Sequence, residues 1–285
     1  MLQTIPLHND FGVELPGIDL KEATQDFLYP ELRAAFEEHS LLLIRGQDWS
    51  DEDILRFGRL FGPIENRTDG PDFVSAVSNV RPDGSVLLPD ALRLKDLQAN
   101  MLWHTDSTFL PVPSLANIIT ARVVPTSGGT TELVSTRAGL ARLPQHLRDA
   151  LGGAFEHRLT HSRRKIDPEL AQADHITKWT GQTWRGIWTN PANGQDAAYI
   201  ASHACGIAGM DPRPAQDLID EIIDALTSED AIYAHHWQVG DVLIWDERAT
   251  LHRAMPWPYE QPRTLASICV SASAADGLDT LRPSA

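Results

Sequence analysis

The sequence has few of the features that mark specialised classes of protein. Its 285 residues include only two cysteines, Cys205 and Cys269, so a disulfide scaffold is excluded and both thiols are expected to be small buried groups in a reducing compartment. No apolar run approaches the roughly eighteen residues that a membrane-spanning helix needs. The N-terminal segment MLQTIPLHNDFGVELPGIDL also lacks the basic and long apolar regions of a signal peptide. These absences predict a cytoplasmic protein that has no membrane partner.

Positive charge is scarce as well. The chain has 24 Lys and Arg against 39 Asp and Glu, which gives a formal net charge of −15. Because binding to phosphate backbones and anionic lipids needs a surplus of Lys and Arg, nucleic acids and membrane surfaces are not expected as partners. A local basic site for a small anion is still compatible with this charge.

Internal repeats and low-complexity linkers are missing too, which favours a single domain spanning residues 1–285. The apolar spacing predicts many short strands with a few peripheral helices, that is, a mainly β sandwich or barrel. Strands are expected within residues 11–20, 41–46, 115–135, 231–237, 240–247, 249–255 and 263–272; helices are expected at 30–40, 50–61, 136–151 and 214–228.

Two stretches show little periodicity. Residues 64–100 are rich in Pro, Gly, Asp and Asn and are expected to form long loops with short strands. Residues 154–190 are poorly patterned, and their basic run HRLTHSRRK is expected to be a solvated loop, with part of a pocket lid as the alternative. Gly128 and Gly129 are expected to form a turn between two strands.

The segment MLWHTDSTF places His104 and Asp106 two positions apart, which on a strand puts both side chains on one face. A His-x-Asp triplet is expected about once by chance in this composition, and His8 and Asp10 form a second copy, expected to be exposed. A non-haem Fe(II) site uses two His and one carboxylate, so a third ligand must come from elsewhere. The strand-like segment WDERATLHRAM supplies His252.

From about GVELPGIDL to RTLASI, the sequence resembles the Fe(II)/2-oxoglutarate dioxygenases of the taurine dioxygenase and 2,4-dichlorophenoxyacetate dioxygenase group. His104, Asp106, His252 and Arg263 match that family's pattern of His-x-Asp, a distant His, and an Arg shortly after it. The resemblance implies Fe(II) held by the first three residues, with 2-oxoglutarate and O2 as cosubstrates. Motif spacing and the strand-rich last third predict a double-stranded β-helix (a jelly roll, cupin-like), with the iron near one mouth.

The segment VVPTSGGTTEL is similar to the family segment whose threonine, here Thr131, shares the distal carboxylate of 2-oxoglutarate with Arg263. Asn100 falls where the family has an active-site asparagine. An Arg and a Thr hydroxyl can clamp one carboxylate with charge-assisted hydrogen bonds. The resemblance implies oxidative decarboxylation of 2-oxoglutarate to succinate and CO2, coupled to hydroxylation of a nearby C–H bond. Because family relatives that halogenate lack the carboxylate ligand, Asp106 favours oxygenation.

SNVRPDGS and NMLWHTDSTFLPV are similar to the family branch that cleaves aryloxypropionates, so an aryloxyalkanoate acid is the predicted substrate. A sulfonate, a sulfate ester or another small acid is the alternative. Family relatives carry a second Arg at the position of Ser267, and in taurine dioxygenase that Arg holds the sulfonate, which weakens taurine as a candidate. A small acid buried beside iron still needs a cation, and the candidates upstream of the metal motif are Arg81, Arg93 and, favoured, Lys95.

The remaining polar and aromatic residues of interest carry weaker expectations. His203 aligns roughly with a segment that lies near the substrate pocket in the family. A structural role for His203 is as compatible with the sequence as a functional one. Trp103 and Trp245 are expected in the core or pocket wall, and His235 and His236 in a strand with no role. The protein is also expected to form a homo-oligomer, a dimer or higher.

Two other functions fit part of the pattern. A zinc hydrolase could use the same three ligands with a bound water, but it leaves Arg263 and Thr131 unexplained. A non-catalytic jelly-roll binding protein is the other alternative, because a fold alone does not guarantee chemistry.

Overall fold

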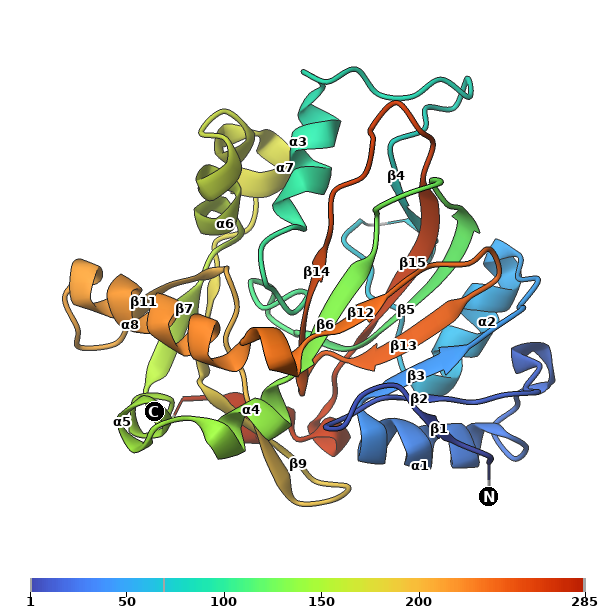
Figure 1. Cartoon of the computed structure of the whole chain (residues 1–285). Helices are drawn as coiled ribbons and strands as arrows, with labels where there is room; N and C mark the ends of the chain where they lie inside the picture. Colours follow the sequence, from blue (N-terminus) through green and yellow to red (C-terminus); the bar gives the residue numbers. More distant parts are fainter. Residues whose placement is uncertain (1, 69, 284–285) are drawn as a thin grey trace.

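A seven-stranded sheet forms the centre of the computed structural model, which describes residues 2–68 and 70–283 (Figure 1). Its strand order is β1-β2-β3-β13-β5-β15-β4, and β2 and β3 are its parallel pair. The strands span Ile5–Pro6 (β1), Val13–Glu14 (β2), Leu41–Ile44 (β3), Val242–Asp246 (β13), Ser114–Val123 (β5), Thr264–Ser271 (β15) and Ser75–Ser78 (β4). The predicted strands at 41–46, 240–247 and 263–272 are therefore confirmed, whereas only two residues of the strand expected at 11–20 are extended in the sheet.

A second, three-stranded sheet packs against the first. Its order is β12-β6-β14, with β12 at Tyr233–His235, β6 at Thr131–Ser135 and β14 at Thr250–Ala254. Leu133 of this sheet lies in one buried cluster with Leu43, Leu243 and Trp245 of the large sheet. The two sheets therefore enclose an apolar core, as Figure 1 shows for β6 and β14 beside β5 and β15.

The central strands are buried on both faces, which explains their unbroken apolar sequences. Along β13, Leu243 and Trp245 face the core between the sheets, whereas Val242 and Ile244 face the helices on the other side. Successive side chains of a strand point to opposite faces, so a strand covered on both sides must be apolar at every position.

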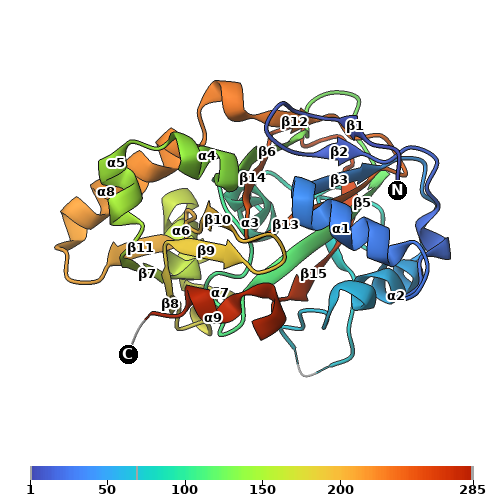
Figure 2. The same cartoon turned by 90° about the horizontal axis from the view of Figure 1, so that it is seen from below.

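Helices α1 (Tyr29–His39) and α2 (Asp51–Phe61) cover this outer face, as predicted for 30–40 and 50–61. Phe36 and Phe57 join them to the sheet in the largest apolar cluster. Ser50 caps α2, because its hydroxyl accepts from the Asp53 amide while the Asp53 carboxylate accepts from the Ser50 amide. Figure 2 shows α1 and α2 at one end of the molecule and α4, α5 and α8 at the other.

The chain between β6 and β12 builds the second end. It contains α4 (Thr136–Arg142), α5 (Gln145–Ala150), α6 (Leu159–Ile166), α7 (Asp174–Thr177) and α8 (Pro212–Leu226), with a sheet of β11-β7-β8 and a β10-β9 hairpin. These strands span Ala204–Ile207 (β11), Ala154–His157 (β7), Gln182–Arg185 (β8), Gln195–Ala198 (β10) and Ile187–Asn190 (β9); α9 (Leu278–Leu281) follows β15 near the C-terminus. The predicted helix at 214–228 is confirmed as α8, whereas the one at 136–151 is broken into α4 and α5 at Pro144, whose ring cannot continue a helix.

Two expectations about local structure are wrong. Residues 64–100 contain a helix, α3 (Leu92–Ala99), and most of the basic run HRLTHSRRK forms α6 rather than a loop. Both helices are short and have a weak apolar pattern, but they pack against each other (Figure 1). This tertiary contact stabilises helices that the local sequence does not predict. His104 belongs to no named strand and forms only an isolated bridge. Within the described residues, no helix is both long and apolar enough to cross a membrane.

Candidate metal centre and its cavity

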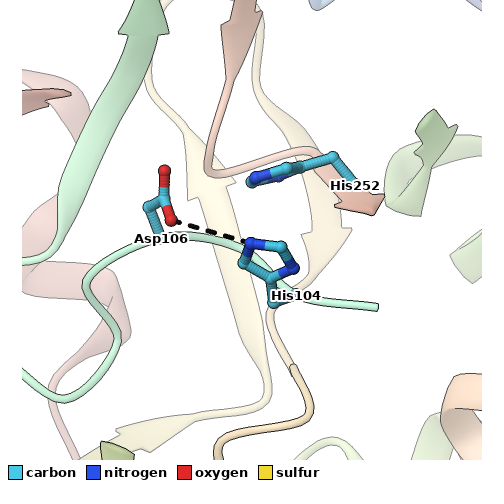
Figure 3. Close-up of side chains that lie close together, drawn as sticks. All are labelled: His104, Asp106 and His252. Atoms are coloured by element: carbon cyan, nitrogen blue, oxygen red, sulfur yellow. Dashed lines mark ion pairs between the residues drawn. The ribbon is translucent and has the colours of Figure 1, made fainter. Parts of the chain in front are cut away.

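The backbones of His104 and His252 meet directly, although the two residues are far apart in the sequence. The His104 amide donates to the His252 carbonyl at 3.0 Å, and the His252 amide donates back to the His104 carbonyl at 2.8 Å. This antiparallel bridge places the two rings 4.1 Å apart between centroids. Asp106 lies beside them, and one potential ligand atom from each of the three residues lies within 4.8 Å of the others (Figure 3). Two imidazoles and one carboxylate at this separation can bind one divalent metal ion.

Hydrogen bonding fixes the tautomer of His104. Its Nδ1 lies 2.7 Å from the Leu102 carbonyl oxygen, and because a carbonyl only accepts, Nδ1 carries the hydrogen. Nε2 then keeps its lone pair and lies 3.9 Å from an Asp106 carboxylate oxygen, the contact drawn in Figure 3. A backbone acceptor behind a histidine is typical of metal-ligating imidazoles.

Burial keeps both imidazoles neutral. It lowers the pKa of His104 and lowers the pKa of His252 to about 3, because a charged ring would be desolvated here. Burial opposes the anion of Asp106, yet the neighbouring imidazoles, Arg67 and the Asn117 amide hold the pKa of this carboxyl below its usual range. At neutral pH the cluster therefore offers two neutral nitrogen donors and one anionic oxygen donor.

Asn117 and Ser267 orient the Asp106 carboxylate. Asn117 on β5 donates from Nδ2 to Asp106 Oδ2 at 2.8 Å, and the Cys269 thiol lies 3.4 Å from the same oxygen. Ser267 donates in turn to the Asn117 side-chain oxygen at 2.9 Å. Because Oδ2 is occupied, Oδ1 is the oxygen left facing His104. Sequence reasoning missed Asn117, since nothing in its segment LANIITA indicates that it reaches Asp106.

Glu247 anchors the loop that carries the metal motif. This carboxyl group is fully buried and lies 2.6 Å from the Thr105 hydroxyl, 2.9 Å from the Asp106 amide and 2.7 Å from the Trp245 indole nitrogen. Burial, together with the charge of Asp106, raises the pKa of Glu247 well above its usual value. Three hydrogen bonds to one side chain fix the position of Asp106 relative to β13.

A cavity of about 270 Å³ opens beside these residues. Asn100, Thr131 and Arg263 line it together with the three clustered side chains. The Asn100 carbonyl accepts from the Ala254 amide, so the segment before the metal motif is tied to β14. The structure thus gathers into one cavity all six residues that the sequence assigned to metal and 2-oxoglutarate.

Arg263 is a buried cation whose guanidinium donates to a backbone carbonyl. Only 2% of its surface is exposed, and its Nε and Nη2 both donate to the Gly129 carbonyl at 3.2 and 3.0 Å. Its guanidinium lies 5.0 Å from the centre of the Trp257 ring. Over residues 2–68 and 70–283, no carboxylate forms an ion pair with it, and burial lowers its pKa to about 10. A buried charge without a partner is unfavourable, so this side of the cavity favours an anion.

The Gly128–Gly129 turn makes the approach to Arg263 possible. Gly129 has a φ of +68°, and a Cβ there would lie 3.1 Å from Arg263 Nε. Thr131 follows on β6, and its hydroxyl oxygen accepts from the Trp237 indole at 3.0 Å, which leaves the hydroxyl hydrogen free to donate. The turn predicted here is confirmed, and it brings a cation and a hydroxyl donor to one wall.

Of the residues predicted to bind the prime substrate, Lys95, Arg81 and His203 do not line the cavity. Lys95 forms an ion pair with Asp167 at 2.6 Å, and Arg81 lies in the loop after β4. His203 is buried behind His104, 6.2 Å between ring centroids, and its Nδ1 lies 2.8 Å from the Ser162 hydroxyl. His203 therefore supports the His104 ring from behind instead of facing the cavity.

Three arginines besides Arg263 line the cavity. They are Arg67, Arg93 and Arg163, of which only Arg93 stood among the sequence candidates. Arg163 comes from the basic run HRLTHSRRK, so this run was the available signal, but only its folding as α6 turns Arg163 inward. Trp245 lines the cavity and lies 4.7 Å from the His252 ring, as expected for a pocket wall.

The second His-x-Asp triplet has none of these companions. Asp10 is exposed and accepts from Arg142 at 2.6 Å, and His8 lies beside it at the surface. The same local spacing therefore yields a clustered donor set at 104–106 and a surface pair at 8–10; Asp10 is exposed as predicted, whereas His8 is partly buried.

Comparison with known proteins agrees with this geometry. The pattern of the family described as "Taurine catabolism dioxygenase TauD, TfdA family" matches residues 3–269. An (S)-phenoxypropionate/alpha-ketoglutarate-dioxygenase from Sphingobium herbicidovorans is 32% identical over 271 residues, 91% of this chain and 91% of that protein. The alpha-ketoglutarate-dependent 2,4-dichlorophenoxyacetate dioxygenase of Cupriavidus pinatubonensis is also 32% identical, over 91% of this chain and 94% of its own.

A solved structure, AAD-2 in complex with Mn(II) and N-oxalylglycine, superposes with a TM-score of 0.88 at 27% identity, over 95% of this chain and 98% of that one. This chain therefore shares its arrangement of sheets and peripheral helices with that dioxygenase structure. With the family pattern matched over most of the sequence and relatives at 32% identity, the chain belongs to the TauD/TfdA family of dioxygenases.

Proposed function

We propose that this protein is an Fe(II)- and 2-oxoglutarate-dependent dioxygenase whose metal ligands are His104, Asp106 and His252. One observation carries the proposal. The potential ligand atoms of two neutral imidazoles and one carboxylate lie within 4.8 Å of one another, and the buried cation Arg263 lines the same cavity. A metal site alone would also suit a hydrolase, but a hydrolase gives no role to a buried guanidinium that has no carboxylate partner.

Arg263 and Thr131 would hold the distal carboxylate of 2-oxoglutarate. Arg263 supplies the charge and Thr131 the hydroxyl donor, and charge-assisted hydrogen bonds of this kind are stronger than neutral ones. Asn100 lines the same cavity and is proposed as a further polar contact to the cosubstrate. When bound, iron and O2 supply the decarboxylation of 2-oxoglutarate to succinate and CO2 and the transfer of one oxygen atom to a C–H bond of the prime substrate.

The proposed prime substrate is a small hydrophobic acid, best an aryloxyalkanoate. Relatives that share 32% identity act on phenoxypropionate and 2,4-dichlorophenoxyacetate. Hydroxylation of the carbon between the ether oxygen and the carboxylate gives a hemiacetal-type carbon, which collapses to a phenol and a 2-oxo acid. Cavity residues such as Phe73, Val77 and Leu97 provide an apolar wall for the ring. A sulfonate or sulfate ester is the alternative acid, although Ser267 provides no positive charge.

The experiment is an assay of purified protein with Fe(II), ascorbate and 2-oxoglutarate. Succinate is expected even without a prime substrate, and phenol is expected when phenoxyacetate or one enantiomer of 2-phenoxypropionate is added. Taurine is the matched acid without an aryl ether. Absence of succinate under all conditions contradicts the dioxygenase, and turnover of taurine alone contradicts the aryloxyalkanoate.

We further propose that residues 1–285 form one catalytic domain with a double-stranded β-helix, or jelly-roll, topology. The support is that successive strands alternate between the two facing sheets: β12 and β14 lie in the small sheet, β13 and β15 in the large one. A cytoplasmic location and a homo-oligomeric state remain predictions, and light scattering on the purified protein measures the second.

Asn117→Ala tests the support of the metal site. Without the amide donor, the Asp106 carboxylate is free to rotate, and loss of such a supporting hydrogen bond weakens metal binding by about 10–100-fold. Equilibrium dialysis with Mn(II) measures this loss separately from activity. Asn193→Ala is the control, because the Asn193 side chain donates to the Glu37 carbonyl on α1 and does not line the cavity. Wild-type Mn(II) affinity in Asn117→Ala would show that Asn117 does not orient the ligand.

A further inference from the structure

Two arginines from distant segments lie on the cavity wall beside the metal cluster. Arg163 is on α6, and Arg67 is in the loop after α2. Burial lowers the pKa of Arg163, and the positive charge of Arg67 lowers it further. The negative charges of Asp96 and Asp106 raise it. Both guanidinium groups line the same cavity as Asp106, and Arg67 donates to the hydroxyl of Ser107, the residue that follows Asp106.

Each of these arginines is held in place by one carboxylate and keeps a free end. Arg163 donates from Nε to Asp96 at 2.9 Å and from Nη1 to Ser162 at 3.5 Å. Arg67 donates from Nε to Glu65 at 2.6 Å and from Nη2 to Ser107 at 3.0 Å. Nη2 of Arg163 and Nη1 of Arg67 have no hydrogen-bond acceptor in the part of the chain that the structure describes. Donors that are fixed by their own ion pair and remain free at one end are suited to bind an anion.

The proposed reaction requires a cation at this place. In an aryloxyalkanoate the carbon that loses its hydrogen also carries the carboxylate, so the cation that binds the acid must lie next to the metal ligands. Arg263 is assigned to 2-oxoglutarate, and Ser267 carries no charge. Arg93, which is exposed like Arg67, donates to the Ala76 carbonyl at 2.8 Å, on the α3 side of the cavity. Arg67 donates to Ser107 beside Asp106, and the charge of Asp106 raises the pKa of both Arg67 and Arg163, so these two cations lie on the side of the cavity that the acid must approach.

We propose that Arg163 and Arg67 form the subsite for the carboxylate of the prime substrate, with Arg163 as its part-buried donor and Arg67 completing it. This inference rests on the proposed function and replaces Lys95 as the acid-binding residue. The carboxylate lies toward α6, which leaves the apolar wall of Phe73, Val77 and Leu97 for the aromatic ring. Substrates that carry the acid on the reacting carbon are then favoured over neutral ethers of the same shape.

A purely structural role for Arg163 must be distinguished, because its bond to Asp96 also joins α6 to α3. The chain offers a matched control. Lys95 and Asp167 join the same two helical segments at 2.6 Å, but neither lines the cavity. Lys95→Gln therefore removes a comparable link without removing a donor from the cavity.

The test measures equilibrium binding to protein loaded with Mn(II) and N-oxalylglycine, in which an NH group replaces a CH2 of 2-oxoglutarate. Phenoxyacetate, both 2-phenoxypropionates and the neutral phenoxyacetamide are titrated by calorimetry into wild type, Arg163→Gln, Arg67→Gln, Arg163→Lys and Lys95→Gln. Because hydrogen bonds to charged groups are strong, the Kd of the bound acid is expected to rise on the order of thirtyfold in Arg163→Gln. The Kd of the amide is expected to stay the same, Arg163→Lys to recover part of the loss, and Lys95→Gln to resemble wild type.

Other outcomes overturn the subsite. An unchanged Kd for the acid in both Gln variants overturns it, and so does an equal loss for acid and amide, which would indicate a structural link. Wild-type protein that binds none of the acids contradicts it as well. Succinate formation without a prime substrate is measured in parallel on wild type and on the control Lys95→Gln, and it is expected in both. Its absence from wild type would instead contradict the proposed dioxygenase.

Discussion

Replacement of Asp106 by alanine is expected to abolish hydroxylation and to leave no detectable succinate at an Fe(II) concentration that saturates wild type. Asp106 is the anionic member of the donor set, and without it the metal would be held by two neutral imidazoles alone. The loss of metal affinity should exceed the roughly 10–100-fold that follows the removal of a supporting hydrogen bond. Mn(II) equilibrium dialysis and succinate formation measure the two effects separately.

The chain contains its own control for this experiment. Asp10 stands in the second His-x-Asp triplet, at the surface and paired with Arg142. Asp10→Ala is expected to bind metal and to form succinate like wild type. Normal succinate formation by Asp106→Ala at limiting iron would show that Asp106 is not a ligand.

Arg263→Ala is expected to raise the 2-oxoglutarate concentration for half-maximal succinate formation by about a hundredfold or more. The wall around Arg263 is buried, so a bound carboxylate would lose its partner in a poorly solvated place. Breaking a buried ion pair costs on the order of 3–5 kcal/mol, which corresponds to this loss of affinity. Arg263→Lys should recover only part of it, because lysine has no planar fork to bind a carboxylate with two hydrogen bonds.

Arg213→Ala is the matched control, since this arginine lies on the exposed face of α8 with 92% of its side chain accessible. Its half-maximal 2-oxoglutarate concentration is expected to equal that of wild type. An unchanged value in Arg263→Ala would remove Arg263 from the cosubstrate site. Mn(II) binding measured on the same sample separates a cosubstrate defect from loss of the metal.

The sequence by itself determined the parts of this protein that depend on local pattern. The unbroken apolar runs LLLI and VLIW predicted β3 and β13, because a central strand must be apolar on both faces. Ser50 and Asp53 predicted the start of α2 through a capping box that spans four residues. The sequence also proposed the metal and 2-oxoglutarate residues as candidates, because each is embedded in a recognisable stretch of neighbouring residues, and all of them line one cavity.

Tertiary structure decided which cations face the cavity. Lys95 and Arg163 lie on helices that pack against each other, yet one side chain turns outward to Asp167 and the other toward the metal cluster. The direction of each side chain depends on how α3 and α6 pack, and neither helix has a strong enough local pattern to be predicted. The contact of Asn117 with Asp106 depends likewise on β5 lying beneath the metal loop. Residues that act by contact between distant segments leave no local signal, because their positions are fixed only when the sheets and helices assemble.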